Sequence, residues 1–245
     1  MDTYPKKLNK CPLVEAVFEI RFDSTVPEDA VFGIVYQSLK PIVNTTKPPI
    51  TLPIVNLPSE IRRSDPNLRF QPHYQIKLDN WTISVGPKTL LFSNRSPYDG
   101  WDDYKKFIIK ALEFIIPSGI ISKVIRTGLR YINVIDGNLF KNTKIDFQIV
   151  ETKLEAEETA IHTTMKVNNG YYINLQLNNN VLMSIDKDPV KRASVIDIDV
   201  AKDQILNLDT FKRNIDEILE ESHSIERERF FSLLTEDFLT SLKSE

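Results

Sequence analysis

The stretch WDDYKKFIIKALEFIIPSGIISKVIRTGLRYINVID, residues 101–136, carries the clearest structural signal in the chain. Its first half repeats apolar residues at helical spacing, which makes one continuous stripe of Tyr104, Phe107, Ile108, Ala111, Leu112 and Ile115. Pro117 and Gly119 predict the end of this helix, and Asp99 is its expected N-cap. The helix therefore has one face to bury.

The second half of the stretch alternates like a β-strand. One face is predicted to hold Ile125, Thr127, Leu129, Tyr131, Asn133 and Ile135. The opposite face is predicted to hold Val124, Arg126, Gly128, Arg130, Ile132 and Val134. We expect the first face to join the core and the second to display two arginines.

The remaining chain predicts strands and helices in a regular order. Residues 12–22 read as a strand, residues 27–41 as a helix, and residues 74–78, 81–85 and 89–92 as three short strands. Alternating segments follow after residue 136, at 145–149, 161–167, 171–177 and 196–200, and a helical region at 210–242 closes the chain, with Asp209 as N-cap and a bend near 222–224.

Alternation with one polar face is typical of antiparallel sheets that are covered on one side. The expected fold is therefore α+β, with mainly antiparallel sheet packed by two or three helices and with a long C-terminal helix. We divide the chain into an N-terminal α+β half, 1–121, which contains the proline-rich segment 41–72, and a C-terminal antiparallel half, 122–245, which ends in the long helix. The order of elements leaves open that the two halves are similar.

Residues 41–72 contain seven prolines and show no helical period. The plain interpretation is an extended surface segment. A lid or an arm that clasps another subunit is the alternative, because long loops in compact domains often serve binding.

Composition favours a folded protein and excludes several function classes. The chain has 245 residues, 41% hydrophobic content, a formal net charge of −3 and a pI near 5.8, so no global charge indicates nucleic acid or an anionic membrane. A lone cysteine, Cys11, an N-terminus without a signal-peptide pattern and the lack of a long apolar run predict a cytoplasmic, prokaryotic protein. Only seven glycines and no phosphate-loop motif predict no cofactor.

Two charged pairs stand on the polar faces of the two clearest strands. Glu15 and Glu19 lie about 13 Å apart at strand rise, which is beyond the roughly 5–9.5 Å of glycosidase carboxylates. Arg126 and Arg130 have the same spacing, so neighbouring strands would form a cross-strand ladder of these four residues. A site in which the arginines hold an acidic ligand is the alternative.

Polar faces of later strands supply further candidates. Tyr172 and Asn174 belong to a face that suits solvent, a ligand or a partner, and Tyr172 would stack a base if that face bound single-stranded nucleic acid. Asp197 and Asp199 share a strand face about 7 Å apart, where they would bind a hard cation if other oxygens converged. The three histidines show no metal-ligand spacing.

One enzymatic hypothesis rests on the order of three residues. Asp136 ends a long strand, and Glu151 and Lys153 follow near the end of the next predicted strand. A nuclease that uses an Asp and a later Glu-x-Lys binds Mg²⁺ through the carboxylates and places the Lys near the attacking water. Such a nuclease fold continues with a helix, whereas this chain continues with strands.

Three motifs resemble an uncharacterised prokaryotic protein family of about this length. They are Pro12-Leu13-Val14-Glu15-Ala16-Val17-Phe18-Glu19-Ile20-Arg21-Phe22; Trp101 and Tyr104 with the later Gly128-Leu129-Arg130-Tyr131-Ile132-Asn133; and His223 with Phe230 and Leu234-Thr235. The resemblance implies sporadic distribution among genomes, no assigned activity and no catalytic residues. It implies an accessory role, including phage defence.

Together these observations favour a non-catalytic binding or scaffold protein that acts on a protein partner or forms a homo-oligomer. A Mg²⁺-dependent nuclease or hydrolase and a single-stranded nucleic-acid binder are the alternatives.

Overall fold

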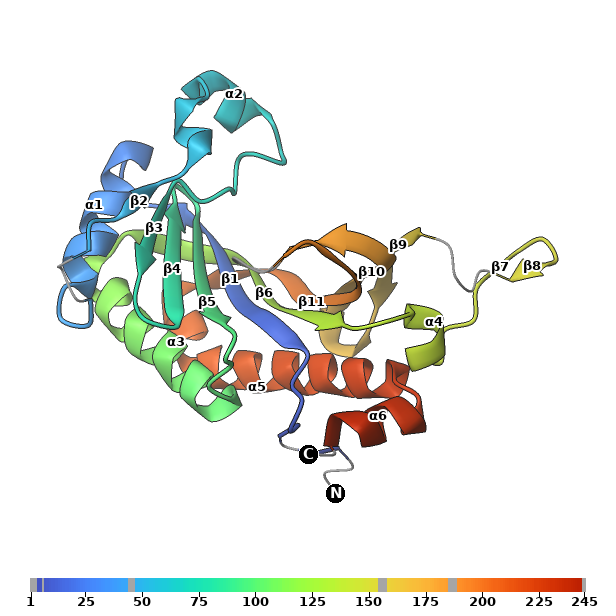
Figure 1. The fold of residues 1–245 in the computed structure, drawn as a ribbon. Helices are drawn as coiled ribbons and strands as arrows, with labels where there is room; N and C mark the ends of the chain where they lie inside the picture. Colours follow the sequence, from blue (N-terminus) through green and yellow to red (C-terminus); the bar gives the residue numbers. More distant parts are fainter. Residues whose placement is uncertain (1–3, 6, 44–46, 154–157, 185–188, 244–245) are drawn as a thin grey trace.

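The computed structural model describes residues 4–5, 7–43, 47–153, 158–184 and 189–243. Nine strands form one antiparallel sheet in the order β2-β3-β4-β5-β1-β6-β11-β10-β9, and β7 and β8 form a separate hairpin (Figure 1). The strands are β1 (Leu13–Ser24), β2 (Ile50–Thr51), β3 (Tyr74–Lys77), β4 (Trp81–Gly86), β5 (Thr89–Arg95), β6 (Ile121–Ile135), β7 (Gln148–Ile149), β8 (Thr152–Lys153), β9 (Thr159–Lys166), β10 (Tyr172–Met183) and β11 (Lys191–Asn207).

Three long helices pack on one face of this sheet. They are α1 (Glu28–Leu39), α3 (Trp101–Ile115) and α5 (Leu208–Leu233), and Figure 1 shows them along the same side. The shorter helical segments are α2 (Ser59–Ser64), α4 (Leu139–Asn142), α6 (Glu236–Lys243) and the 3₁₀ turns Pro53–Asn56, Ile116–Ser118 and Asn168–Gly170. The α+β class, the antiparallel sheet and the long C-terminal helix are confirmed.

The strand order repeats about the centre of the sheet. From β1 outward the strands run β1, β5, β4, β3, and from β6 outward they run β6, β11, β10, β9. Each half thus has one long strand at the centre and then three strands that return to it, followed by a helix, α3 or α5. The predicted division at residue 121 falls where β6 begins, and the β1–β6 pairing joins both halves in one sheet.

Two apolar clusters fill the space between the sheet and the helices. The first surrounds Phe18, Phe92, Tyr104 and Ile108, so the predicted stripe of α3 is buried as expected. The second surrounds Ile173, Ile198 and Phe230 at the β10–β11 end of the sheet. The long helix α5 contributes residues to both clusters and so spans the two halves.

The strand at 121–135 keeps its predicted alternation except at its start. β1 pairs with β6, and the register passes from Arg21 opposite Arg126 to Phe22 opposite Val124. The extra residue, Ile125, makes a β-bulge, which reverses the faces before it. Val124 is therefore fully buried in the core, and its predicted place beside the arginines is wrong.

The helix termini also differ from the expectation. Gly100, not Asp99, precedes α3, because the Asp99 carboxylate accepts a 2.9 Å hydrogen bond from Asn94 Nδ2 instead of capping the helix. Asn207, not Asp209, caps α5 by accepting from the Thr210 amide at 2.8 Å. The predicted bend near 222–224 is wrong, since α5 runs without a break to Leu233 and α6 follows.

The proline-rich segment is more structured than its composition predicts. Between residues 47 and 72 the described chain forms the edge strand β2, a 3₁₀ turn and α2, so the prediction of a wholly extended segment is wrong. The segment predicted at 145–149 is also reduced, to the two residues of β7. In Figure 1, α2 and its loop stand out from the sheet on the side away from α3 and α5. We call residues 41–72 the arm.

None of the helices in the described ranges is long and apolar enough to cross a lipid bilayer.

Candidate functional site

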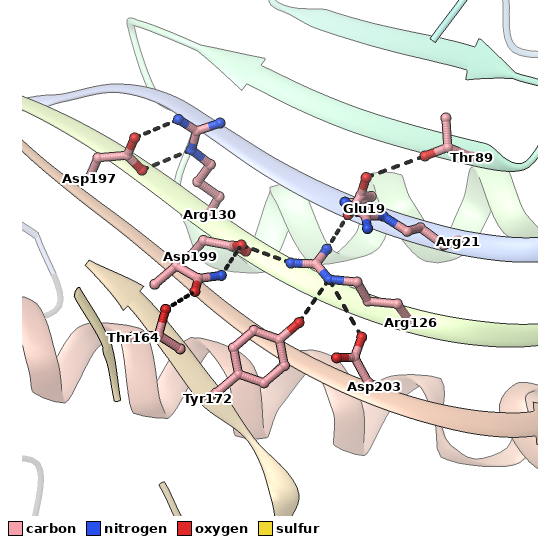
Figure 2. A network of polar contacts seen from close by, with 11 residues as sticks. Glu19, Arg21, Thr89, Arg126, Arg130, Thr164, Tyr172, Asp197, Asp199 and Asp203 are labelled. Carbon is pink, nitrogen blue, oxygen red and sulfur yellow. Dashed lines mark hydrogen bonds and ion pairs between the residues drawn. The ribbon is translucent and has the colours of Figure 1, made fainter. Parts of the chain in front are cut away.

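The sheet face opposite α1, α3 and α5 is polar along its central strands. We call it the open face, and it presents Glu15, Glu19 and Arg21 from β1, Arg126, Gly128 and Arg130 from β6, Asp197, Asp199 and Asp203 from β11, Tyr172 and Asn174 from β10, and Thr164 from β9. The places on β6, β10 and most of β1 and β11 follow from strand alternation, because the intervening residues are buried under the helices. Figure 2 shows most of these side chains, with a network around Arg126 and a separate pair of Arg130 and Asp197.

Arg126 is the centre of the network. Its Nη1 donates to Glu19, its Nη2 donates to Asp199 at 2.8 Å, and its Nε donates to the Tyr172 hydroxyl at 3.2 Å (Figure 2). Only 8% of its side chain is exposed. Burial opposes the charge, but Asp199 and Glu19 outweigh it, so the pKa of the guanidinium is raised and the group stays charged. One arginine thereby ties together β1, β6, β10 and β11.

Gly128 provides the space in which the Arg126 guanidinium lies. A Cβ atom on Gly128 would stand 2.8 Å from Arg126 Nη1 and 3.1 Å from Asp199 Oδ1. No real side chain accepts such contacts without displacement. The glycine therefore lets the arginine lie flat across its own strand and reach two acidic partners.

Arg130 makes a separate pair with Asp197. Its Nε and Nη2 donate to the two carboxylate oxygens at 2.8 and 2.5 Å, which is the bidentate geometry of a strong ion pair. This bond raises the pKa of the Arg130 guanidinium. The Arg130 side chain is 43% exposed, and its Nη1 takes no part in the pair. Arg130 thus keeps one edge toward the solvent.

The predicted four-residue ladder forms in part. Its strands are neighbours, and Glu19 pairs with Arg126 as expected. Glu15 instead lies 3.5 Å from Arg95 on β5, and Arg130 turns to Asp197 on β11. The difference arises because each strand has a second neighbour in the sheet. Arg95 on β5 pairs with Glu15 of β1, and Asp197 on β11 pairs with Arg130 of β6.

The arm overhangs this face, and between the two lies a partly open cavity of about 420 Å³. Its floor holds Arg126, Gly128, Arg130 and Asp199, and its roof comes from residues 66–72 of the arm. Phe70 in the roof stacks on Arg21, whose Cζ lies 4.8 Å from the ring centroid. The volume is within the range of small-molecule sites.

The remaining predicted residues of the face also join the network. Tyr172 accepts from Arg126, Asn174 Nδ2 donates to Asp199 Oδ2 at 3.2 Å, and Thr164 donates to Asn174 at 2.9 Å. Asp197 and Asp199 each accept from an arginine. Within the described residues no group of three or more His, Cys, Asp or Glu side chains is placed to hold a metal ion.

The three residues of the nuclease hypothesis belong to different parts of the fold. Asp136 follows β6 and lies 2.8 Å from Lys191 at the start of β11. Glu151 and Lys153 belong to the β7–β8 hairpin, and Lys153 lies 3.6 Å from Asp146. In Figure 1 this hairpin projects from the sheet beyond α4. The nuclease hypothesis expects consecutive strands of one sheet, whereas β6 belongs to the large sheet and β7 and β8 form a separate hairpin.

Neither a protein-family model nor a curated protein matches this sequence.

Three parts of the site were missing from the sequence prediction. The sequence pattern gives Arg21 no role, does not link Gly128 to Arg126, and places Phe70 in a segment predicted to be extended. A glycine between two arginines on one strand face is a readable signal, because it removes a side chain where a long one must lie. The position of Phe70 over Arg21 depends on the path of the arm and has no local signal.

Proposed function

We propose that this chain is a non-catalytic binding protein that holds a small acidic molecule, with a carboxylate or phosphate group, between the open face and the arm. The observation that carries the proposal is the cluster of three guanidinium groups, from Arg21, Arg126 and Arg130, in the lining of one cavity. Glu19 and Asp199 also line it and Arg130 pairs with Asp197, so these charges balance. The donor groups that the pairs leave unused lie under a roof that partly shields them from water, where a charge pair is stronger than at an open surface.

Two of the arginines have unused capacity to donate hydrogen bonds. Arg130 engages Asp197 through Nε and Nη2, which leaves Nη1 for a ligand oxygen. Arg21 Nε is buried 3.1 Å from Glu19 without a hydrogen bond to any described residue, while 32% of the Arg21 side chain is exposed and borders the cavity. Planar guanidinium groups suit carboxylates and phosphates because they present paired N–H groups. These two residues are the proposed ligand contacts.

The other residues of the network hold the site in shape. Glu19 and Asp199 accept from Arg126 and are thereby neutralised, so they repel an incoming anion less than unpaired carboxylates would. Tyr172 accepts a hydrogen bond from Arg126, and Asn174 donates one to Asp199, so both partners of the Arg126–Asp199 pair are held in place. Apolar Val17, Leu91 and Phe70 complete the walls and suit the carbon skeleton of the ligand.

An NMR titration tests the proposal with phenyl phosphate and phenylacetate as probes and phenol as the neutral counterpart. The two acids should move the side-chain Nε–H signals of Arg21 and Arg130, and phenol should not. Arg130→Gln should weaken acid binding about tenfold or more, as expected for the loss of a hydrogen bond to a charged group. A response to phosphate alone, or to carboxylate alone, would identify the acidic group.

Arg130→Lys and Arg213→Gln are the matched variants. Arg130→Lys keeps the positive charge but loses the paired N–H groups of the guanidinium, so it should bind the acids more weakly than the wild type and more tightly than Arg130→Gln. Arg213 is an exposed residue of α5, on the other side of the sheet, and its loss should change nothing. Equal weakening by Arg130→Gln and Arg213→Gln, or no signal shift with either acid, refutes the proposal.

The cellular role belongs to the same proposal. The family resemblance implies an accessory or defence-associated protein in a prokaryotic cytoplasm, and a ligand-sensing binding protein with a protein partner or a second copy suits such a role.

A further inference from the structure

A second pocket lies on the helix-covered side of the sheet, distinct from the open face. It has a volume of about 250 Å³ and lies between α5, β6 and the N-terminal residues Pro5 and 7–13. Aromatic rings form much of its wall, from Tyr98, Trp101, Tyr131 and Phe230. For comparison, a cavity of about 150 Å³ accepts benzene, so this pocket admits a somewhat larger molecule.

Glu226 projects into this pocket without a partner. Its residue is only 2% exposed, and its Oε1 makes no hydrogen bond with any described residue. It stands at a position of α5 that the apolar stripe would otherwise fill, three residues after His223 and four before Phe230. A buried carboxyl group without a donor or a counter-charge destabilises the fold, so such a residue needs an explanation.

The nearby polar atoms satisfy one another and leave Glu226 out. The hydroxyls of Tyr98 and Tyr131 lie 2.9 Å apart, and that of Tyr131 lies 3.2 Å from His223 Nδ1. Trp101 stacks on the His223 ring at 4.0 Å between centroids. Burial lowers the pKa of His223 to about 4, so the ring is neutral at pH 7 and supplies no positive charge to the pocket.

The basic residues at the pocket are directed elsewhere. Arg227 Nη2 donates to the carbonyl of Tyr4 at 2.5 Å, which fastens the N-terminal segment to α5. Lys7 is exposed at the rim. In the described part of the chain no ion pair involves Glu226, so neither of the two basic residues that line the pocket neutralises this carboxyl group.

We propose that this pocket binds a small organic cation, with the Glu226 carboxylate as its counter-charge and the surrounding aromatic rings as its walls. A primary ammonium group supplies three donors to the carboxylate, and aromatic rings attract cations through their negative faces. The site is independent of the acidic-ligand cavity on the open face.

Binding in this pocket is coupled to proton release. Burial raises the pKa of Glu226 to about 8, so the group is mostly protonated at pH 7 and must ionise when a cation binds. The other titratable or charged groups that line the pocket are Lys7, Cys11, Tyr98, Asp99, Tyr131, His223 and Arg227. Benzylamine should therefore release protons on binding at pH 7, which calorimetry in buffers of different ionisation enthalpy measures.

The test compares benzylamine with benzyl alcohol and benzoate, which share its ring. The chain has two tryptophans, and only Trp101 lines the pocket, so its indole N–H signal should shift with benzylamine while that of Trp81 should not. Glu226→Gln keeps the shape and removes the charge, and it should bind benzylamine at least about tenfold more weakly. Benzyl alcohol and benzoate should bind the wild type more weakly than benzylamine does.

Glu217→Gln is the control, because Glu217 is an exposed residue of the same helix. It should bind benzylamine like the wild type. Equal binding of benzylamine by Glu226→Gln and the wild type overturns the proposal. So do stronger binding of benzyl alcohol or benzoate and a lack of saturable benzylamine binding. Glu226→Gln should fold, since a neutral amide replaces a carboxyl group that is mostly protonated at pH 7, and a thermal melt verifies this.

Discussion

The guanidinium of Arg126 lies against the Cα of Gly128, two residues along the same strand, so a Cβ atom at residue 128 would stand 2.8 Å from Arg126 Nη1. Because of this contact Arg126 reaches Glu19 on one neighbouring strand and Asp199 on the other. The charge network of the open face depends on a residue that has no side chain.

Gly128→Ala should therefore destabilise the protein. The added methyl group displaces a guanidinium that is held on both sides, and overpacking of this kind costs about 1–3 kcal/mol. Urea unfolding measures the loss. Gly33→Ala is the control, because Gly33 lies within α1 with no atom near its Cβ position. It should be neutral or stabilise by up to about 1 kcal/mol. Equal effects of the two substitutions would contradict this assignment to Gly128.

Arg126→Met should be more damaging than Arg95→Met. The Arg126 side chain is 8% exposed, and its removal leaves the largely buried Asp199 without a cation and Glu19 with Arg21 alone, which costs about 3–5 kcal/mol. The Arg95 side chain is 51% exposed, so loss of its pair with Glu15 should cost about 1 kcal/mol or less. Chemical denaturation measures the free energy of unfolding of both variants. A smaller loss for Arg126→Met than for Arg95→Met would show that the network contributes little to folding.

The stability of the protein should fall between about pH 6.5 and pH 8. Burial raises the pKa of Glu226 from 4.5 to about 8, so in this window the folded chain keeps a proton that the unfolded chain has lost. The slope is up to about 1.4 kcal/mol per pH unit. Burial lowers the pKa of His223 from 6.5 to about 4, which gives an opposite slope below pH 6.5.

Glu226→Gln isolates the carboxyl group in that experiment. Unfolding curves measured from pH 5 to pH 8.5 should show a flatter profile for this variant above pH 6.5, and greater stability than the wild type at pH 8. Glu217→Gln should retain the wild-type slope. Parallel profiles for Glu226→Gln and the wild type would show that Glu226 ionises normally.

The nuclease hypothesis makes a different prediction from the proposed binding role. It requires Mg²⁺-dependent cleavage of DNA or RNA that is lost on Lys153→Ala. We expect the wild type to leave labelled DNA and RNA intact with Mg²⁺ and without it, because Asp136 pairs with Lys191 and Lys153 belongs to another hairpin. Cleavage by the wild type that disappears in the variant would restore the enzymatic interpretation.

Alternation along β1 and β6 is enough to predict their faces and their α+β setting, because side-chain direction in a strand is a local property. It does not predict neighbours on both sides. For this reason the faces of β1 and β6 predict the Glu19–Arg126 pair, whereas the Arg130–Asp197 pair can be predicted only when β11 is known to be the other neighbour of β6. The bulge at Ile125 is likewise set by pairing and has no mark in the alternation.

The burial of Glu226 could have been predicted from the sequence. This residue replaces an apolar residue on the buried stripe of α5, and the surrounding run of charged residues concealed that break in the pattern. The cavity under Phe70 had no comparable signal, since it depends on how the arm folds over the sheet.

A crystal structure of the complex with phenyl phosphate tests the central claim most directly. The account predicts that the phosphate lies beneath Phe70, within hydrogen-bond distance of Arg130 Nη1 and the Arg21 guanidinium, while Arg126 keeps its bonds to Glu19 and Asp199. A phosphate bound elsewhere, or one that reaches the open face only by displacing Asp199 from Arg126, would contradict it.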